Sequence, residues 1–335
     1  MKVRFDLTGA AVALLSAWLF AAEPAGAATR TATPATIEAV LAQARGGDTI
    51  VLSAGVYLEV RVYNLHPVTP VTINASAATI RYMPFQNSSS FTLIGGAFGP
   101  SVYGTVTFLN SHDITAQGGA YSGAGTAAIA VTNSQHINLV SNTITGSRGD
   151  GVDIAASQYV LVQGNICLNN VPTPIHPDCV QMWSVIGRPQ VSHITITGNQ
   201  ARGNTQGFDL FDHGTGGGSY IDIDHNVICT THTWAGQVNS ATNSTMTDNV
   251  AYTLPGAVFG FAPPTWQLTA NQTDTSDGGN THGDVFKSNA NGAAPNQANT
   301  YPPCPVSAGS GVSLTSGGDA KAASLALGGR GGVHP

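Results

Sequence analysis

The chain has 335 residues, of which only 9% are charged, with 12 Lys and Arg against 18 Asp and Glu and a formal net charge of −6. This balance excludes a nucleic-acid binder that works through a basic stripe, because such proteins need clustered Lys and Arg to displace counterions from phosphates. The 40 glycines, and the lack of periodic Glu, Lys, Leu and Ala runs, favour β structure with many turns.

The first 28 residues are typical of a secretory signal peptide. Lys2 and Arg4 give a basic start, an apolar run follows at 9–22, and residues 25–27 read A-G-A, which fits a cleavage site. No later stretch approaches the roughly 18 consecutive apolar residues of a membrane span. We therefore expect an exported protein, secreted or periplasmic, with no membrane partner.

The segment 34–59 predicts a helix that ends at Gly46-Gly47, where glycine provides a left-handed stop, and then two strands joined by a turn. This opening resembles that of pectate-lyase-like parallel β-helix proteins, in which the helix caps the open end of the coil. A cap is needed because a bare terminal coil exposes a sheet edge.

An internal repeat is the strongest signal in the chain. Short β-prone segments each begin after an Asn, and the Asn residues are separated by 23, 34, 27, 23 and 22 positions: Asn142, Asn165, Asn199, Asn226, Asn249 and Asn271. Two more short strands precede each Asn, and three strands per repeat are typical of a parallel β-helix. Asn suits one fixed corner because its amide can bond the amide one coil away and because it tolerates a left-handed backbone. An antiparallel sandwich would not reuse one Asn register.

We therefore predict an all-β fold, a single-stranded right-handed parallel β-helix with an N-terminal capping helix. The signal peptide occupies 1–28, the β-helix domain 29–304, and a Gly/Ala/Ser-rich, disordered tail 305–335. The four cysteines can form disulfides in an exported chain, but three pairings are possible and the sequence does not choose among them: Cys167, Cys179, Cys229 and Cys304.

The third strand of each repeat carries acidic residues in register. Alignment of the repeats points Val152, Val180 and Phe208 inward, so the next residue of each strand, Asp153, Gln181 or Asp209, points outward. The turn before each strand carries Asp150, Asp178 or Gln206. Because coils stack at roughly 4.8 Å, these side chains should converge on one outer face.

Stacked carboxylates repel one another and shift their pKa values, so a proton, a cation or a substrate should compensate them. The alternative is that the individual Asp residues only stabilise turns and have no catalytic role. The candidate catalytic residues are Asp150, Asp153, Asp178, Asp209, His176 and His213. The candidate substrate-binding residues are Gln181, Trp183, Gln206, Asp212, Arg148, Arg202, Gln237 and Asn239; no metal ligand is assigned.

Residues 149–154, G-D-G-V-D-I, followed by 177–184, P-D-C-V-Q-M-W-S, resemble the motifs of polygalacturonase-type glycoside hydrolases. The resemblance implies that Asp150 and Asp178 match two of that family's aspartates. Three departures stand against it: Pro177 replaces the first residue of the Asp-Asp pair, Gln206 stands where a histidine is expected, and no R-I-K follows.

These features predict an enzyme that cleaves glycosidic bonds in a polysaccharide and acts as a monomer, and they assign no certain cofactor. Hydrolysis, which needs one protonated and one ionised carboxyl group, is slightly preferred. A polysaccharide lyase acting on a uronan with Ca²⁺, or a uronate epimerase, stays open, although the outward strand positions carry no Lys or Arg. A non-catalytic glycan-binding β-helix is the third reading, with sugar-stacking candidates in Trp183, Phe211, Tyr220, Trp234 and Trp266.

Overall fold

A computed structural model of the chain describes residues 26–168, 177–210, 216–230, 234–238, 241–247, 249–253, 265–268 and 297–298. Most of the expected signal peptide, Asn271, Cys304 and the expected disordered tail lie outside the described residues, and those expectations stay predictions.

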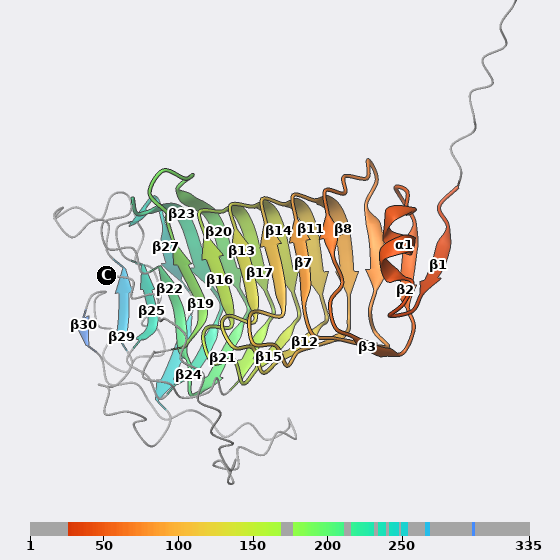
Figure 1. Cartoon of the computed structure of the whole chain (residues 1–335). Coiled ribbons are helices and arrows are strands. Elements are labelled where there is room, and N and C mark those ends of the chain that lie inside the picture. The colour runs from red at the N-terminus through yellow and green to blue at the C-terminus, as the bar shows by residue number, and fades with distance from the viewer. Residues whose placement is uncertain are drawn as a thin grey trace, which may run out of the picture. The chain divides into compact units, whose positions relative to one another are not determined.

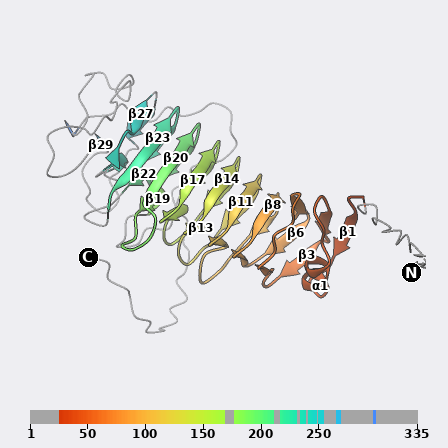
Figure 2. The ribbon, with the colours of Figure 1, turned by 90° about the horizontal axis from the view of Figure 1, so that it is seen from above.

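The described strands form three sheets of 11, 10 and 9 strands, and each coil contributes one strand to each sheet in turn. Figures 1 and 2 show the strands of successive coils lying side by side along the axis. All pairings are parallel except the last, between β29 and β30. The predicted parallel β-helix is confirmed.

Sheet A contains β1 (Thr29–Ala32), β2 (Thr49–Leu52), β5 (Val71–Asn74), β8 (Ser89–Ile94), β11 (His112–Gln117), β14 (Gln135–Val140), β17 (Gln158–Gln163), β20 (Val191–Thr197), β23 (Gly218–Asp224), β26 (Ala241–Thr242) and β27 (Thr245–Thr247). Sheet B contains β3 (Gly55–Tyr57), β6 (Ala78–Ile80), β9 (Ala97–Phe98), β12 (Ala120–Ser122), β15 (Thr143–Thr145), β18 (Ile166–Leu168), β21 (Gln200–Gly203), β24 (Val227–Thr230) and β28 (Val250–Thr253).

Sheet C contains β4 (Val62–Tyr63), β7 (Met83–Gln86), β10 (Val106–Leu109), β13 (Ile129–Thr132), β16 (Val152–Ala155), β19 (Asp178–Trp183), β22 (Gln206–Leu210), β25 (Trp234–Val238), β29 (Thr265–Leu268) and β30 (Gln297–Ala298). Alternate residues of each strand fill the interior, where Val, Ile, Leu and Phe side chains form one buried core along the coils.

The expected capping helix is present but shorter than predicted. Helix α1 runs Ile37–Ala42, buries Ile37 and Leu41, and contacts β1 and β2 (Figure 1). It ends before Gly46-Gly47 because Asp48 accepts the backbone N–H of Arg45 and draws the chain into a turn. Gly47 provides the left-handed conformation, at φ 88°, inside this turn rather than at the helix end. Within the described residues, no helix is long and apolar enough to cross a membrane.

The Asn register forms a buried ladder at the corner between sheets A and B, from Asn142 to Asn249. In the first four of these residues, the backbone N–H and the side-chain amide both donate to the Oδ1 of the Asn one coil further on, at 2.8–3.0 Å. The second side-chain hydrogen donates to a carbonyl oxygen of a neighbouring coil, for example that of Leu139 for Asn165. The predicted bond from one Asn to the next is confirmed, but the expected left-handed backbone lies one residue earlier, at Ser141, Gly164, Gly198 and His225.

Two further ladders were not predicted. At the corner between sheets C and A, the backbone N–H groups of Ser88, Ser111 and Ser134 each donate to the hydroxyl of the serine one coil further on, ending at Ser157. On the outside of the same corner, the rings of His136, Tyr159, His193 and Tyr220 stack with centroids 4.5–4.9 Å apart. Both ladders repeat a side-chain contact once per coil, and so help to hold the stack in register.

Candidate functional site

The corner between sheets B and C brings together four aspartates from three consecutive coils. Asp153 of β16 is the register partner of Gln181 of β19, which is the partner of Asp209 of β22. Their strand neighbours, among them Val152, Val180 and Phe208, lie in the core, so these three side chains leave the sheet on its outer side. The predicted register is confirmed, and Gln237 of β25 extends the same column by one coil.

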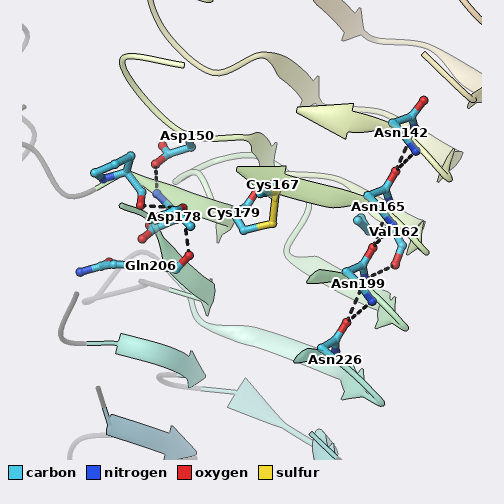
Figure 3. The surroundings of a disulfide bond; sticks show 12 residues. Asn142, Asp150, Val162, Asn165, Cys167, Asp178, Cys179, Asn199, Gln206 and Asn226 are labelled. Atoms are coloured by element: carbon cyan, nitrogen blue, oxygen red, sulfur yellow. Dashed lines mark hydrogen bonds between the residues drawn. A yellow bond between two sulfur atoms is a disulfide. The ribbon is translucent and has the colours of Figure 1, made fainter. Parts of the chain in front are cut away.

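A second column lies beside the first, in the turns that lead into the same strands. The backbone N–H of Asp178 donates to Oδ1 of Asp150 at 2.7 Å, and the N–H of Gly151 donates to the carbonyl oxygen of Asp178 at 2.7 Å. Gln206 is the register partner of Asp178. Figure 3 shows Asp150, Asp178 and Gln206 following one another coil by coil on the same side. We call Asp150, Asp153, Asp178 and Asp209 the acidic corner.

A disulfide fixes the entry into β19. Cys167 of β18 bonds Cys179 of β19, with 5.6 Å between their Cα atoms. Figure 3 shows this bond between the acidic corner and the asparagine ladder. Cys229 is also disulfide-bonded. Because Cys179 follows Asp178 directly, the covalent bond holds the backbone that carries this aspartate.

The four aspartates differ in their access to solvent. Asp150 and Asp153 are half-buried, whereas Asp178 and Asp209 are 1% and 0% exposed. We expected all of them on an open outer wall. The expectation was right for the direction of Asp153 and Asp209, but an outward direction does not ensure exposure, and Asp178 and Asp209 are covered.

Burial raises the pKa of three of these carboxyl groups. Loss of hydration raises the pKa of Asp209 to about 8. The interaction with Asp178 lowers this pKa but is the smaller effect. Burial, followed by the nearby charges of Asp209 and Asp150, raises the pKa of Asp178 well above the ordinary value. Burial and then the charge of Asp150 do the same for Asp153. The carboxyl group of Asp153 lies close to that of Asp150, and that of Asp178 close to that of Asp209. Two neighbouring carboxyl groups can approach in this way when they share a proton.

The candidate substrate-binding residues divide into those at the corner and those elsewhere. Gln181 and Trp183 are half-buried on β19, while Gln206 and Gln237 are buried. Arg148 is exposed two residues before Asp150.

Arg202 does not join them. It lies on β21 of sheet B, and its Nε donates to the side-chain oxygen of Gln200 on the same strand at 3.1 Å. Tyr220, a sugar-stacking candidate, lies on β23 of sheet A in the ring stack instead. Both residues therefore lie on other sheets than the acidic corner, and their roles in substrate binding stay predictions. His176, His213, Asp212, Asn239 and Phe211, and the side chains of Trp234 and Trp266, lie outside the described residues.

Buried amide groups at the corner lack hydrogen-bond partners. Neither Nε2 nor Oε1 of Gln206 has a partner within the described part of the chain, and the same holds for Oε1 of Gln237. A buried amide without a partner carries an uncompensated desolvation cost. In the described ranges, no group of three or more His, Cys, Asp and Glu side chains has the arrangement of a metal site.

A family model described as "Periplasmic copper-binding protein (NosD)" matches residues 42–176, which is less than half of the chain. No curated protein matches. The strand topology makes the chain a parallel β-helix, as the sequence predicts.

Ten solved chains match the protein. PfbA, a surface adhesin of Streptococcus pneumoniae, is 11% identical over 71% of this chain and 78% of its own, with a TM-score of 0.42. The pectate lyase Pel9A is 14% identical over 84% of this chain and 90% of its own, with a TM-score of 0.39. An alginate lyase from Paenibacillus sp. str. FPU-7 is 16% identical over 77% of this chain and 99% of its own, with a TM-score of 0.37. Likenesses of this size assign no residue a role.

Proposed function

We propose that this protein is an exported enzyme that cleaves glycosidic bonds in a polysaccharide, with carboxyl groups of the acidic corner as acid and base. One observation carries the proposal: the chain brings four aspartates of three coils to one corner, where burial and mutual repulsion raise the pKa values of three of them. Carboxyl groups kept protonated near neutral pH are what a general acid requires.

Hydrolysis is the reaction that these groups fit best. One carboxylic acid must protonate the oxygen of the leaving sugar, and one carboxylate must activate water or attack carbon. Asp153 is half-buried and has a raised pKa, so it can meet a substrate while still carrying its proton. We assign it the acid role.

The second carboxyl group is Asp209, two coils away; because its pKa is raised to about 8, it serves as the carboxylate only when the pH is high enough to remove its proton. Two coil spacings separate carboxyl groups by roughly 10 Å, close to the upper end of the inverting range. Asp178 lies next to Asp209, and the repulsion between their charges disfavours ionisation of both groups at once. Asp150 holds the β19 entry through the Asp178 N–H and positions Asp153.

Elimination by a lyase, and epimerisation, need a base beside a uronate carboxyl and a cation to stabilise the enolate. The described strands of sheet C contain no Lys or Arg. No calcium or copper site is proposed, because the described residues hold no fitting ligand group.

A panel of neutral and uronic polysaccharides, each incubated with and without a chelator, tests the proposal. New reducing ends without ultraviolet absorbance of an unsaturated uronate support hydrolysis; absorbance in that band would assign the protein to the lyases. Retention of a polysaccharide with no product, unchanged in Asp153→Asn, would make the protein a binding module.

A further inference from the structure

We propose that the exposed ring stack at the corner between sheets C and A is a second binding surface for a polysaccharide, separate from the acidic corner. The stack has one ring per coil, and we call it the ring ladder: His136, Tyr159, His193 and Tyr220. The inference takes its class of ligand from the proposed function, on which it rests in that respect, and adds a surface that anchors the polymer.

The ring ladder lies on the coils that carry the acidic corner. The chain passes from β16, β19 and β22 of sheet C into β17, β20 and β23 of sheet A, which lie side by side in Figures 1 and 2 and carry Tyr159, His193 and Tyr220. Tyr159 follows Asp153 by six positions, so the two columns are at most roughly 20 Å apart. A polymer held at the ring ladder is therefore kept close to the acidic corner.

The rings of the ladder are open to solvent. Tyr159 and Tyr220 are 44% and 51% exposed, and the two histidines are exposed as well. Apart from the stacking, Tyr159, His193 and Tyr220 make no hydrogen bond or ion pair with the rest of the described chain. His136 lies beside Asp113, with 3.6 Å between Nδ1 and Oδ1. The ladder thus presents phenol oxygens and ring nitrogens to a ligand.

The backbone under the ladder suits residues other than tyrosine. All four positions have a positive φ, between 51° and 56°. In the coils on either side, the same register position carries Asp113 and Asn243, and short polar residues of this kind tolerate the left-handed conformation. A tyrosine in that conformation is rare and strained, and strained residues cluster at functional sites. A contact made by the rings therefore explains them better than the turn does.

The coils do not need the ring ladder to stay in register. Each ring residue is followed, six positions later, by an asparagine of the buried ladder: Asn142, Asn165, Asn199 and Asn226. The same four coils are therefore already joined by buried side-chain hydrogen bonds. The ring stack adds to this contact, but a role in register alone does not require its polar edges to face solvent.

The shape of the ladder fits a linear polymer. Ring centroids follow one another at 4.5–4.9 Å, in a strip one ring wide. A globular protein partner needs a patch of about 800 Å² on each side, which is far wider than this strip. A sugar chain that lies along the coil axis can contact every ring. Tyr and His edges combine C–H groups with a polar atom, as sugars do, and rings already ordered by stacking lose little entropy on binding.

Variants that remove a ring without disturbing the turn test the proposal. Tyr159→Asn and His193→Asn introduce a residue that tolerates the left-handed backbone, so both variants should remain folded. His225→Asn is the matched control. His225 is also exposed, with a φ of 52°, but it lies at the corner between sheets A and B.

Native gels cast with polygalacturonate, alginate, galactan, glucan, mannan or xylan measure binding as retarded migration. Initial rates measure turnover of the polymer and of the shortest oligosaccharide that the protein cleaves. We expect each ladder variant to bind the most strongly retarding polymer several-fold more weakly and to have a KM for it that is higher by a similar factor, because one aromatic contact is lost. The kcat, and the KM for the oligosaccharide at the acidic corner, should not change. The control should match the unmodified protein.

Unchanged retardation and KM in both ladder variants would overturn the inference and leave the proposed function standing. An equal loss in His225→Asn would also contradict it, as would a dimer that Tyr159→Asn dissociates, because the ladder would then join two copies of the chain. Retardation that depends on the ladder, without turnover of any polymer, would support the inference and overturn the proposed function. Neither retardation nor turnover on any polymer would overturn both.

Discussion

The backbone N–H of Asp178 donates to Oδ1 of Asp150 at 2.7 Å, although 28 residues separate the two positions. This bond joins consecutive coils at the point where the chain enters sheet C. It fixes one oxygen of Asp150, whose carboxyl group also lies next to that of Asp153. The corner is therefore one connected network, and a change at one aspartate should be felt by its neighbours.

Asp153→Asn should abolish most of the turnover. The amide keeps the size of the side chain but has no acidic proton to give to a leaving oxygen, so kcat should fall by about 10²–10⁴. Initial rates on the best polymer of the panel measure the effect. Asp113→Asn is the matched control, because Asp113 is exposed on β11 of sheet A, beside His112. Full activity in Asp153→Asn would remove Asp153 from the acid role.

Stability should decline as pH rises from about 4 to about 8. The pKa of Asp209 is raised from 3.8 to about 8 in the folded protein, so the folded state holds a proton that the unfolded state releases at lower pH. The resulting stabilisation is complete below pH 3.8 and is lost as pH rises towards 8. Denaturant unfolding across this range measures the slope. Asp209→Asn should reduce the dependence of the free energy of unfolding on pH. An unchanged dependence would show that other groups cause it.

Asp48 should cause the folded protein to lose stability at acidic pH. Its carboxylate accepts the N–H groups of Ala28 and Arg45 and the Nε of Arg30, at 2.8–3.0 Å. The N–H of Arg45 and the side chain of Arg30 lower its pKa to about 2. This stabilisation is present above pH 3.8 and is lost as pH falls through 2.

Asp48→Asn should therefore release β1 at neutral pH, because the amide lacks the charge and one of the acceptor oxygens. Hydrogen exchange of the β1 amides measures the release. Exchange as slow as in the unmodified protein would show that backbone pairing with β2 holds β1 by itself.

The sequence predicts the coil because the fold repeats a short contact many times. Asn142 and Asn165 carry the register in their spacing, and the structure places them in the ladder that this spacing indicates. The serine ladder had a comparable signal, since Ser88, Ser111 and Ser134 are each 23 positions apart, but serine is common in turns and drew no prediction.

The solvent exposure of the aspartates in the acidic corner could not be predicted from the repeat. Alternation along β22 fixes the direction of Asp209 but not the access of solvent to it, which depends on every group that packs over the sheet. The sheet on which Arg202 lies was not predictable for a related reason. The turn between β21 and β22 is short, so a shift of four residues moves a side chain from sheet B to sheet C.

Loss of the Asn165 donor should destabilise the coil. In Asn165→Asp, a carboxylate replaces the amide that donates to the Leu139 carbonyl and to Asn199 Oδ1. A buried charge then faces acceptor oxygens, and we expect a cost of about 3 kcal/mol or more in the free energy of unfolding. Asn138→Asp is the matched control on the half-buried outer face of sheet A. Equal losses in both variants would contradict a special role for the ladder.

Removal of the Cys167–Cys179 bond should affect both stability and activity. The bond closes a loop of 12 residues that leads directly into Asp178, so Cys167→Ala with Cys179→Ala should lower the free energy of unfolding by about 2–3 kcal/mol. Under conditions where the variant is still folded, kcat should also fall, because the backbone of Asp178 loses its covalent support while the strand pairing of β19 persists. Thermal unfolding and initial rates, measured on the same preparation, separate the two effects. A variant that loses stability but keeps its kcat would show that the hydrogen bond from Asp178 to Asp150 positions the corner without help from the disulfide.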